Sequence, residues 1–206
     1  GPALLIGLSD IVIMTSDAYA FVTGPTMVAE FTGVVISNDE LGGSDIHAKQ
    51  SGVAHLVVAD RETAFAEVEH VLSFLPDNVN EIAAAVATSD SVDRLTPEAS
   101  ALIPENPTGA YNVKAVIRSI ADDGYLLELR ERWAPNIVTG LITIGAQSVG
   151  VVANQPMNLA GTLDIPASQK AARFVAFCDA FNIPILTLVD TPGFYPGKDL
   201  EWRGMI

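Results

Sequence analysis

The chain has 206 residues, 49 % hydrophobic and 17 % charged, which is enough to form a sizeable core in one large domain or two small ones. An excess of acidic residues gives a formal net charge of −14, which disfavours nucleic acid and anionic membranes as partners. A single cysteine, Cys178, excludes a disulfide framework, so we expect a buried structural thiol and a cytoplasmic, reducing environment. Because the sequence has no apolar run of about 18 residues and no leader-like start, we expect neither a membrane span nor a signal peptide.

The first apolar segments predict a helix followed by two strands. Residues 1–8 (GPALLIGL) are typical of the first turns of a buried helix, with Pro2 at the first helical position, where its missing N–H costs nothing. The short apolar runs 10–14 and 18–22 are typical of buried strands.

Two glycine-containing turns follow. Thr23-Gly24-Pro25 interrupts the chain, and we expect Thr26 to cap a short helix over residues 27–31. Gly42 and Gly43 come after an acidic pair, and they allow the backbone to adopt positive φ or to approach a ligand closely.

The three histidines, His47, His55 and His70, are scattered and lack the spacing of metal ligands. We interpret each of them as a surface or hydrogen-bonded residue, and we predict no metal site in this chain.

A strand and a helix are predicted next. Residues 51–58 (SGVAHLVV) run into an edge strand, and Asp60 is the expected N-cap of the following helix. We assign the apolar stripe of that helix to the core, and it comprises Phe65, Val68, Val71, Leu72 and Leu75.

Residues 76–110 differ in composition from their surroundings. Several prolines punctuate a segment rich in Asp, Asn, Ser and Thr, so we predict an inter-domain linker there, with a helical turn over residues 82–86. A short helix is predicted over residues 111–120.

The C-terminal third predicts a strand–helix–strand unit. Residues 142–144 and 149–153 are expected to pair as a hairpin, and Ser168 is the expected cap of a helix that ends before Pro184. Residues 185–189 predict a second strand, buried on both faces and parallel to residues 149–153. The apolar face of the helix comprises Ala171, Phe174, Val175, Cys178 and Phe181.

The segment Asp190–Phe194 (DTPGF) follows that strand, at the place where the ligands of parallel sheets collect. The pattern LVDTPG also fits the second nucleotide-binding motif of GTPases, in which an Asp-x-x-Gly turn meets magnesium and phosphate. A GTPase also needs G-x-x-x-x-G-K-[ST] upstream to cradle the phosphates, and this sequence has no such segment. The GTPase interpretation therefore fails for this chain.

Residues 149–197 (VGVVANQPMNLAGTLDIPASQKAARFVAFCDAFNIPILTLVDTPGFYPG) closely resemble the start of the C-terminal domain of acyl-CoA carboxylase carboxyltransferase (beta) subunits, the propionyl-CoA and acetyl-CoA carboxylase family. Other segments resemble the same family, namely F-x-T-G-P at 21–25, L-G-G-x-x-x-H at 41–47, S-G-V-A at 51–54 and the stretch 102–140. The resemblance implies an α/β fold made of two partial crotonase-like domains of the ClpP/crotonase superfamily.

The resemblance also implies a domain map. Residues 1–75 would form the C-terminal part of the N-terminal carboxyltransferase domain, on the acyl-CoA side. Residues 76–110 would be the linker, and residues 111–206 would be the start of the C-terminal carboxyltransferase domain, on the biotin side. We therefore expect a central fragment of a longer subunit, inactive on its own.

The implied activity is carboxyl transfer from N-carboxybiotin on a carrier domain to the α-carbon of acetyl-CoA or propionyl-CoA. The catalytic residue would be Gly1, whose backbone N–H at a helix start would stabilise the enolate oxygen. The remaining site residues that the resemblance implies are Thr23, Gly24, Pro25, Gly42 and Gly43 around the acyl-CoA, and Pro192, Gly193 and Phe194 on the biotin side.

No side chain of this chain is expected to act as the general base. Hydratases of the crotonase superfamily place a catalytic glutamate just after the F-x-T-G-P turn, whereas this chain has Thr26, Met27 and Val28 there, with Glu30 further along. The resemblance implies that biotin itself, once released from carboxybiotin, accepts the α-proton.

The implied cofactor is biotin carried on a partner, and the implied partners are a biotin carboxylase/biotin carrier (alpha) subunit and further beta subunits in a hexamer. Two alternatives stay open. One is a biotin-dependent acyl-CoA decarboxylase carboxyltransferase, which a membrane-embedded partner subunit would distinguish. The other is a non-catalytic crotonase-like assembly module, which would fail to bind acyl-CoA.

Overall fold

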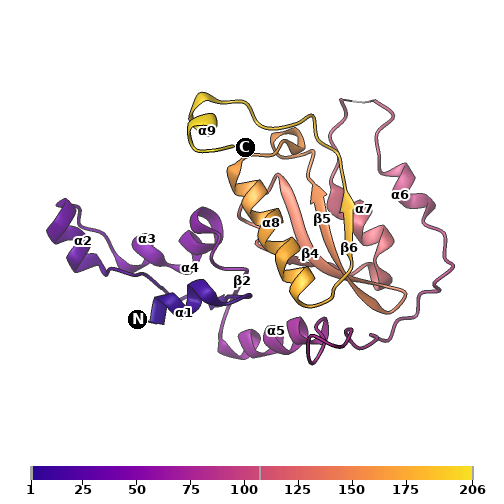
Figure 1. Cartoon of the computed structure of the whole chain (residues 1–206), viewed down its shortest axis with the longest axis horizontal. Helices are drawn as coiled ribbons and strands as arrows, with labels where there is room; N and C mark the ends of the chain where they lie inside the picture. Colours follow the sequence, from indigo (N-terminus) through magenta and orange to yellow (C-terminus); the bar gives the residue numbers. More distant parts are fainter. Residues whose placement is uncertain (1, 107, 206) are drawn as a thin grey trace. The chain divides into compact units, whose positions relative to one another are not determined.

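The structure is a computed structural model that describes residues 2–106 and 108–205 (Figure 1). The chain forms two compact units. The first unit comprises Gly1–Val71 together with Arg130–Trp133, and the second comprises Leu72–Leu129 and Ala134–Ile206.

The first unit contains a two-stranded parallel sheet. Strand β1 (Ile13–Thr15) pairs with β2 (Leu56–Val58), and Met14 lies opposite Val57. The core of this unit is small, with Met14, Ala48 and Ala54 at its centre. Helix α1 (Pro2–Leu8) precedes β1, the helices α2 (Pro25–Thr32), α3 (Asn38–Gly42) and α4 (Ser44–Ile46) and the π-helical turn η1 (His47–Ser51) connect β1 to β2, and α5 (Arg61–Ser73) follows β2.

Side-chain hydrogen bonds define where two of these helices begin. Ser37 Oγ accepts a hydrogen bond from the N–H of Glu40 (3.2 Å), and Glu40 Oε2 accepts one from the N–H of Ser37 (3.0 Å), which forms a capping box at the start of α3. Asp60 Oδ1 accepts a hydrogen bond from the N–H of Thr63 (2.9 Å). This bond confirms Asp60 as the cap of α5.

The second unit is built on a four-stranded mixed sheet with the strand order β3-β4-β5-β6. Strands β3 (Leu127–Leu129), β4 (Ile137–Ile144) and β5 (Gln147–Asn154) are antiparallel, and β6 (Ile185–Leu188) is parallel to β5. The turn between β4 and β5 has φ of 57° at Gly145 and 67° at Ala146, the left-handed conformation that a two-residue type I′ hairpin requires. The predicted hairpin is therefore confirmed.

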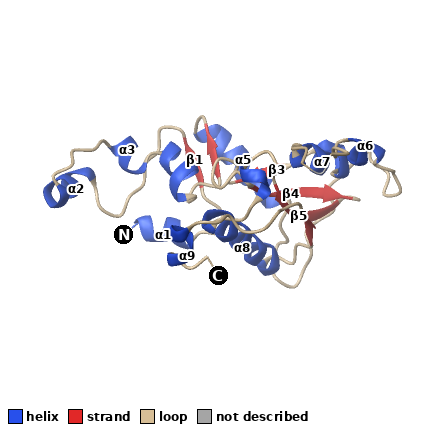
Figure 2. Ribbon diagram, turned by 90° about the horizontal axis from the view of Figure 1, so that it is seen from above, coloured by secondary structure: helices blue, strands red, loops and turns tan. Residues whose placement is uncertain are grey.

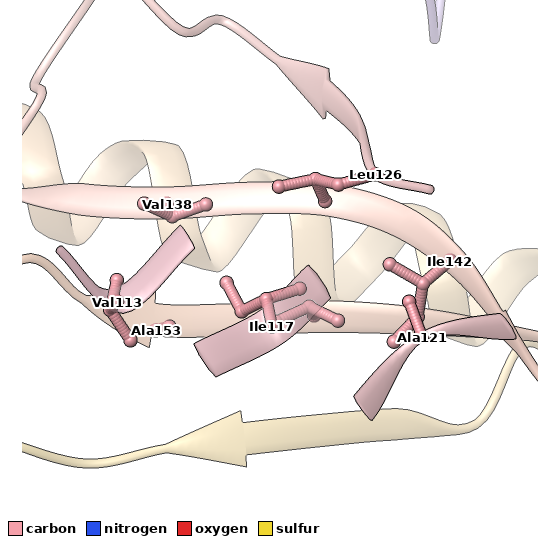
Figure 3. Close-up of a cluster of buried hydrophobic side chains, with 8 residues drawn as sticks. Val113, Ile117, Ala121, Leu126, Val138, Ile142 and Ala153 are labelled. Carbon is pink, nitrogen blue, oxygen red and sulfur yellow. The ribbon is translucent and has the colours of Figure 1, made fainter. Parts of the chain in front are cut away.

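The predicted strand–helix–strand unit is confirmed as well, because helix α8 (Ile165–Ala180) connects the parallel strands β5 and β6. Helix α7 (Val113–Ile120) and helix α8 lie on opposite sides of β4 and β5 (Figure 2). On the α7 side, Ile117 belongs to an apolar cluster of this unit (Figure 3), which comprises Val113, Ile117, Ala121, Leu126, Val138, Ile142, Val151 and Ala153.

Alternate residues of β5 face α7 and α8. Val151 and Ala153 belong to the cluster with α7, whereas a β-carbon at Gly150 would lie close to Cys178 and Phe174 of α8. Successive residues of a strand point to opposite faces, so the two helices cover opposite faces of the same sheet.

Four short elements complete the second unit: α6 (Pro97–Ala101), η2 (Asp122–Gly124), η3 (Leu159–Gly161) and α9 (Lys198–Trp202). The predicted linker segment, residues 76–110, makes hydrogen bonds within this unit. The N–H of Val86 donates to the carbonyl of Ala146 (2.8 Å), and the Arg94 guanidinium donates to the carbonyl of Ile120 (2.6 Å). The assignment of residues 1–75 and 111–206 to an acyl-CoA side and a biotin side stays a prediction.

Two predicted elements do not form within the described residues. Residues 18–22 make no strand, because the N–H of Ala18 donates to the carbonyl of Thr15 (3.0 Å) and turns the chain, and only Tyr19 then forms a single bridge, with Gly43. Residues 82–86 form no helical turn, and Val86 bonds to the β4–β5 turn instead.

Two predicted helix caps are wrong. Gly24 rather than Thr26 is the N-cap of α2, because Pro25, with its fixed φ, occupies the first turn of that helix. Asp164 rather than Ser168 is the N-cap of α8, because its carboxylate accepts a hydrogen bond from the N–H of Ala167 (2.9 Å) and so starts the helix earlier.

Several apolar side chains that we predicted to be buried are exposed. They are Leu4, Leu5 and Leu8 in α1, Phe65, Val68 and Leu72 in α5, and Val175 in α8. Strand β6 is not buried on both faces either, since Ile185 is exposed and the strand pairs only with β5 among the described residues. Helical or strand periodicity identifies a shared face, but it does not show whether another element covers that face.

Within the described residues, every helix is too short or too polar to span a bilayer.

Candidate functional site

The residues predicted for the acyl-CoA side lie on two turns of the first unit. Gly24 and Pro25 begin α2, whereas Gly42 and Gly43 lie where α3 ends and α4 begins. The Phe21 ring contacts both turns, because a β-carbon at Gly24 would lie 3.4 Å from its Cε2 and one at Gly42 would lie 3.3 Å from its Cδ1. The structure therefore brings the two predicted turns together around Phe21.

Gly42 allows a close approach of two backbone segments. The N–H of Ala20 donates to the carbonyl of Gly42 (2.8 Å), and the N–H of Ser44 donates to the carbonyl of Ala18 (3.0 Å). A β-carbon at position 42 would collide with the carbonyl oxygen of Ala20. Of the two roles that the sequence allowed for this glycine pair, the structure shows close approach, here to the chain's own backbone.

His47 connects the segment that carries Phe21 to the π-helical turn η1 by hydrogen bonds. Its Nε2 lies 2.7 Å from the carbonyl oxygen of Ala20 and its Nδ1 lies 2.8 Å from Ser51 Oγ. Since a carbonyl oxygen can only accept, Nε2 donates to Ala20. The interpretation of His47 as a hydrogen-bonded residue is confirmed, but sequence reasoning missed that it holds the segment that carries Phe21. That bond joins positions 27 apart in the sequence, so no local signal marked it.

Two carboxylates close to the glycine pair in sequence, those of Glu40 and Asp45, are engaged in local bonds. Hydrogen bonds from the backbone N–H and the hydroxyl of Ser37 lower the pKa of Glu40. Asp45 pairs with Lys49 (2.6 Å) and with Arg132, and these two side chains lower the pKa of Asp45. Among the residues that the structure describes, no group of three His, Cys, Asp or Glu side chains is placed to hold a metal ion.

The residues predicted for the biotin side form one loop of the second unit, directly after β6. The N–H of Leu163 donates to the carbonyl of Gly193 (3.0 Å), and the N–H of Gly193 donates to Thr191 Oγ1 (3.2 Å). Gly193 has φ of 137° and open space at the position of a β-carbon, and the Phe194 side chain is 63 % exposed next to the exposed Pro192. The loop thus presents a glycine and an aromatic ring beyond the carboxyl end of β6.

Two residues that sequence reasoning did not single out hold the start of this loop. The Tyr111 hydroxyl donates to Asp190 Oδ2 (2.9 Å), and Asn154 Oδ1 accepts from the N–H of Asp190 (3.2 Å). A polar Asn154 at the end of a buried strand was the available signal for one of them. Nothing local marks Tyr111, which is 79 positions away from Asp190 in the sequence.

Two other predicted residues have different outcomes. Gly1 lies outside the described residues, so its proposed contact with the enolate oxygen stays a prediction.

Cys178 is fully buried, and this burial raises the pKa of its thiol to about 12. A protonated, inaccessible thiol cannot serve as a nucleophile, so the predicted structural role of Cys178 is confirmed.

Comparison with known proteins extends over the whole chain. Residues 1–206 match the family described as the carboxyl transferase domain. The chain is 46 % identical over 200 residues to the propionyl-CoA carboxylase beta chain of Roseobacter denitrificans and 41 % identical over 200 residues to the methylmalonyl-CoA decarboxylase subunit alpha of Veillonella parvula. Each of these alignments covers 97 % of this chain and 39 % of the relative, so the chain spans about two fifths of the length of these relatives.

A solved structure shows the same similarity in three dimensions. Transcarboxylase 12S, solved with methylmalonyl-coenzyme A and methylmalonic acid bound, matches 100 % of this chain and 39 % of its own chain, with 43 % sequence identity and a TM-score of 0.94. This match confirms the predicted α/β, crotonase-like fold. On its sequence and on its structure, the chain belongs to the carboxyl transferase domain family.

Proposed function

We propose that the protein transfers a carboxyl group from N-carboxybiotin to the α-carbon of a short acyl-CoA, either acetyl-CoA or propionyl-CoA. One observation carries this proposal. The whole of this chain matches 39 % of the transcarboxylase 12S chain at a TM-score of 0.94, and that structure holds methylmalonyl-coenzyme A. A shared fold alone would not indicate a reaction, but 43 % identity over the whole chain supports a shared site chemistry.

The first unit would form the acyl-CoA side. Thr23, Gly24, Pro25, Gly42 and Gly43 would shape the pocket, because the turns that hold them are packed around one ring and fixed by backbone hydrogen bonds. The N–H of Gly1 would stabilise the enolate oxygen as it develops. Hydrogen-bond donors that are already fixed in place stabilise a developing oxyanion without reorganising at the moment of reaction.

The second unit would form the biotin side, with Pro192, Gly193 and Phe194 in contact with the cofactor. These residues fit a fused bicyclic ring, because Phe194 exposes an aromatic surface on which the ring can pack and the open space at Gly193 admits a close approach. When bound in its carboxylated form, biotin supplies the carboxyl group and afterwards a base for the α-proton. The chain's own task would be to hold the ring and to exclude water.

The proposed mechanism uses no protein carboxylate as a base. The first turn of α2, which follows the F-x-T-G-P segment, carries Thr26, Met27 and Val28, and Glu30 lies further along with an exposed side chain. The capping box occupies the carboxylate of Glu40. These positions support biotin as the proton acceptor.

The proposed partners follow from the same relatives. Biotin would arrive on a carrier that belongs to a biotin carboxylase/biotin carrier (alpha) subunit. The protein itself would form a homo-oligomer, and we propose a hexamer because the transcarboxylase 12S structure is described as a hexamer assembly. We also propose that it works in the cytoplasm.

The reverse half-reaction tests this function directly. We expect the full-length gene product, incubated with free biotin and either malonyl-CoA or methylmalonyl-CoA, to form acetyl-CoA or propionyl-CoA at a rate that depends on both reagents. The matched control omits biotin. Binding of acetyl-CoA or propionyl-CoA without biotin-dependent turnover of either carboxylated ester would contradict the proposal, and a failure to bind any acyl-CoA would favour the non-catalytic assembly module.

A second candidate function is that of a biotin-dependent acyl-CoA decarboxylase carboxyltransferase. The observation that favours it is the 41 % identity to the methylmalonyl-CoA decarboxylase subunit alpha of Veillonella parvula. Both candidates predict the half-reaction above, so the partner distinguishes them. Co-purification of the full-length protein with a membrane-embedded subunit would favour the decarboxylase, and co-purification with a biotin carboxylase would favour the carboxylase.

A further inference from the structure

The loop Asp190–Phe194 is anchored at its first residue by the side chain of Asn154. Asn154 Oδ1 accepts a hydrogen bond from the N–H of Asp190 (3.2 Å), and Asn154 Nδ2 donates to the carbonyl of Gly161 (2.9 Å). Asn154 itself is buried at the end of β5. One buried amide therefore joins the end of β5, the turn at Gly161 and the start of the loop.

Gly161 brings its own turn into direct contact with the start of the loop. It has φ of 70°, and a β-carbon at this position would lie 2.6 Å from the carbonyl oxygen of Asp190. The two residues before it, Leu159 and Ala160, also have positive φ, which costs free energy in residues that carry a β-carbon. The chain thus maintains an unfavourable turn at the point where it contacts the loop.

Tyr111 adds a second anchor from a different part of the sequence. Its ring packs against the apolar cluster of the second unit, which fixes where the ring lies. Its hydroxyl donates to Asp190 Oδ2 at 2.9 Å, and the Asp190 side chain is otherwise exposed. Burial and the neighbouring Asp190 raise the pKa of Tyr111 to about 12, so the hydroxyl keeps its proton and remains a donor at neutral pH.

The far end of the loop is held by backbone bonds to Leu163, and the Thr191 hydroxyl also hydrogen-bonds to Gly193 within the loop. Leu163 donates its N–H to the carbonyl of Gly193 (3.0 Å) and accepts at its own carbonyl from the N–H of Tyr195 (2.8 Å). Between these anchors the Phe194 ring extends into solvent. A loop with both ends fixed and an exposed aromatic ring is suited to meeting a ligand without first becoming ordered.

We propose that Tyr111 and Asn154 are positioning residues, which hold the Asp190–Phe194 loop in the conformation that receives the ring of biotin. Tyr111 acts through the carboxylate of Asp190 and Asn154 through the Asp190 backbone, and neither residue touches the reacting atoms. This inference rests on the proposed function for the identity of the ligand, but the loop-holding role does not depend on it.

The variant Tyr111→Phe tests the inference, because it removes only the hydroxyl and keeps the ring that packs in the core. In hydrogen-exchange mass spectrometry of the full-length gene product, we expect the peptide covering residues 189–196 to exchange about tenfold faster than in the wild type, with other peptides unchanged. Tyr125→Phe, at an exposed tyrosine of the same unit, is the matched control and should leave that peptide unchanged.

Kinetics of the same variants test the ligand. With methylmalonyl-CoA and free biotin, we expect Tyr111→Phe to raise the KM for biotin about five- to tenfold and to leave the KM for the CoA ester within about twofold. Asp190→Ala should reproduce this pattern, and Asp190→Asn, which keeps an oxygen acceptor for the Tyr111 hydroxyl, should restore most of the affinity for biotin.

The outcomes distinguish the loop-positioning role from the assignment of the loop to biotin. Unchanged exchange at residues 189–196 in Tyr111→Phe would overturn the positioning role of Tyr111. Faster exchange with an unchanged KM for biotin, or with a raised KM for the CoA ester instead, would overturn the assignment of this loop to biotin. If the wild-type protein showed no carboxyl transfer, the proposed function would fail, and the exchange measurement would still decide the positioning role.

Discussion

The indole ring of Trp133 lies directly against the α-carbon of Gly52, in the space that a side chain at position 52 would occupy. Gly52 ends the π-helical turn η1 with φ of 65°, and its carbonyl accepts a hydrogen bond from Arg130 Nε (2.6 Å). The N–H of Arg130 also donates to the carbonyl of His55 (2.9 Å). Through these contacts Arg130–Trp133, although it lies between β3 and β4 in the sequence, belongs to the first unit.

The contact predicts that Gly52→Ala destabilises the first unit more than left-handed φ alone would. Gly33 is the matched control, because it has a similar φ of 73° and open space at the position of a β-carbon. We expect Gly33→Ala to cost about 1 kcal/mol from φ alone, and Gly52→Ala to cost roughly 1–3 kcal/mol more because Trp133 must move. Urea unfolding of the full-length protein measures the difference, and equal losses in the two variants would show that Trp133 yields without cost.

The sequence predicted those parts of the fold whose signal is local. The end of β4 at residues 142–144, the apolar run of β5 and the turn between them are adjacent in the sequence, and the apolar stripe of α8 repeats along a single helix, so local patterns identified the hairpin and the strand–helix–strand unit. The contact between Gly52 and Trp133 joins distant positions, and no local pattern reports such a contact. The segment 18–22 failed for a related reason, because the turn at Ala18 and the pairing of Tyr19 with Gly43 overrode its apolar composition.

Two neighbouring residues of α8 test which face of that helix is buried. Phe174 is 4 % exposed and its ring stacks on Phe177, whereas Val175 is 42 % exposed. We expect Phe174→Ala to lower the free energy of unfolding by about 3–5 kcal/mol, as a large-to-small change in a core does. Val175→Ala, the control, should change it by about 0.5 kcal/mol or less. Similar losses in the two variants, measured by urea unfolding of the full-length protein, would show that the face is assigned wrongly.

Cys178 gives a prediction about reactivity. Because burial raises the pKa of its thiol to about 12 from an ordinary value of 9.0, the folded protein holds it protonated at pH 8. We expect iodoacetamide to leave the peptide that contains Cys178 unmodified in the native protein and to alkylate it fully in about 6 M guanidinium. Rapid alkylation of the native protein, detected by mass spectrometry, would contradict the burial of this residue.

The raised pKa of Cys178 also affects stability at high pH. The folded-state pKa of Cys178 lies above its unfolded-state value, so the folded state binds the thiol proton more tightly. The resulting contribution to stability is complete below pH 9 and is lost as the pH rises from about 9 to about 12. Replacing Cys178 with Ala should therefore flatten the decline in stability over this interval, as urea unfolding at several pH values would show.

The candidate site was predictable from the sequence only in part. Gly24, Gly42 and the DTPGF segment stand out because glycine and proline mark backbone that must turn or pack closely. The residues that hold them, His47 on one unit and Tyr111 and Asn154 on the other, act through hydrogen bonds to distant backbone or side chains. Such bonds depend on the tertiary fold, and a single sequence does not record them.

No carboxylate near the F-x-T-G-P turn is expected to act as the general base. Glu40 is engaged with Ser37, whose hydrogen bonds lower the pKa of the Glu40 carboxyl and make it a weaker base, and Glu30 and Asp39 are exposed. We therefore expect Glu30→Gln, Asp39→Asn and Glu40→Gln, made singly in the full-length protein, each to leave kcat for biotin-dependent carboxyl transfer within about tenfold of the wild type. Loss of a true general base costs a factor on the order of 10²–10⁴. A loss of that size in one variant, with normal acyl-CoA binding and unchanged urea unfolding, would identify that carboxylate as the base and rule out proton transfer to biotin.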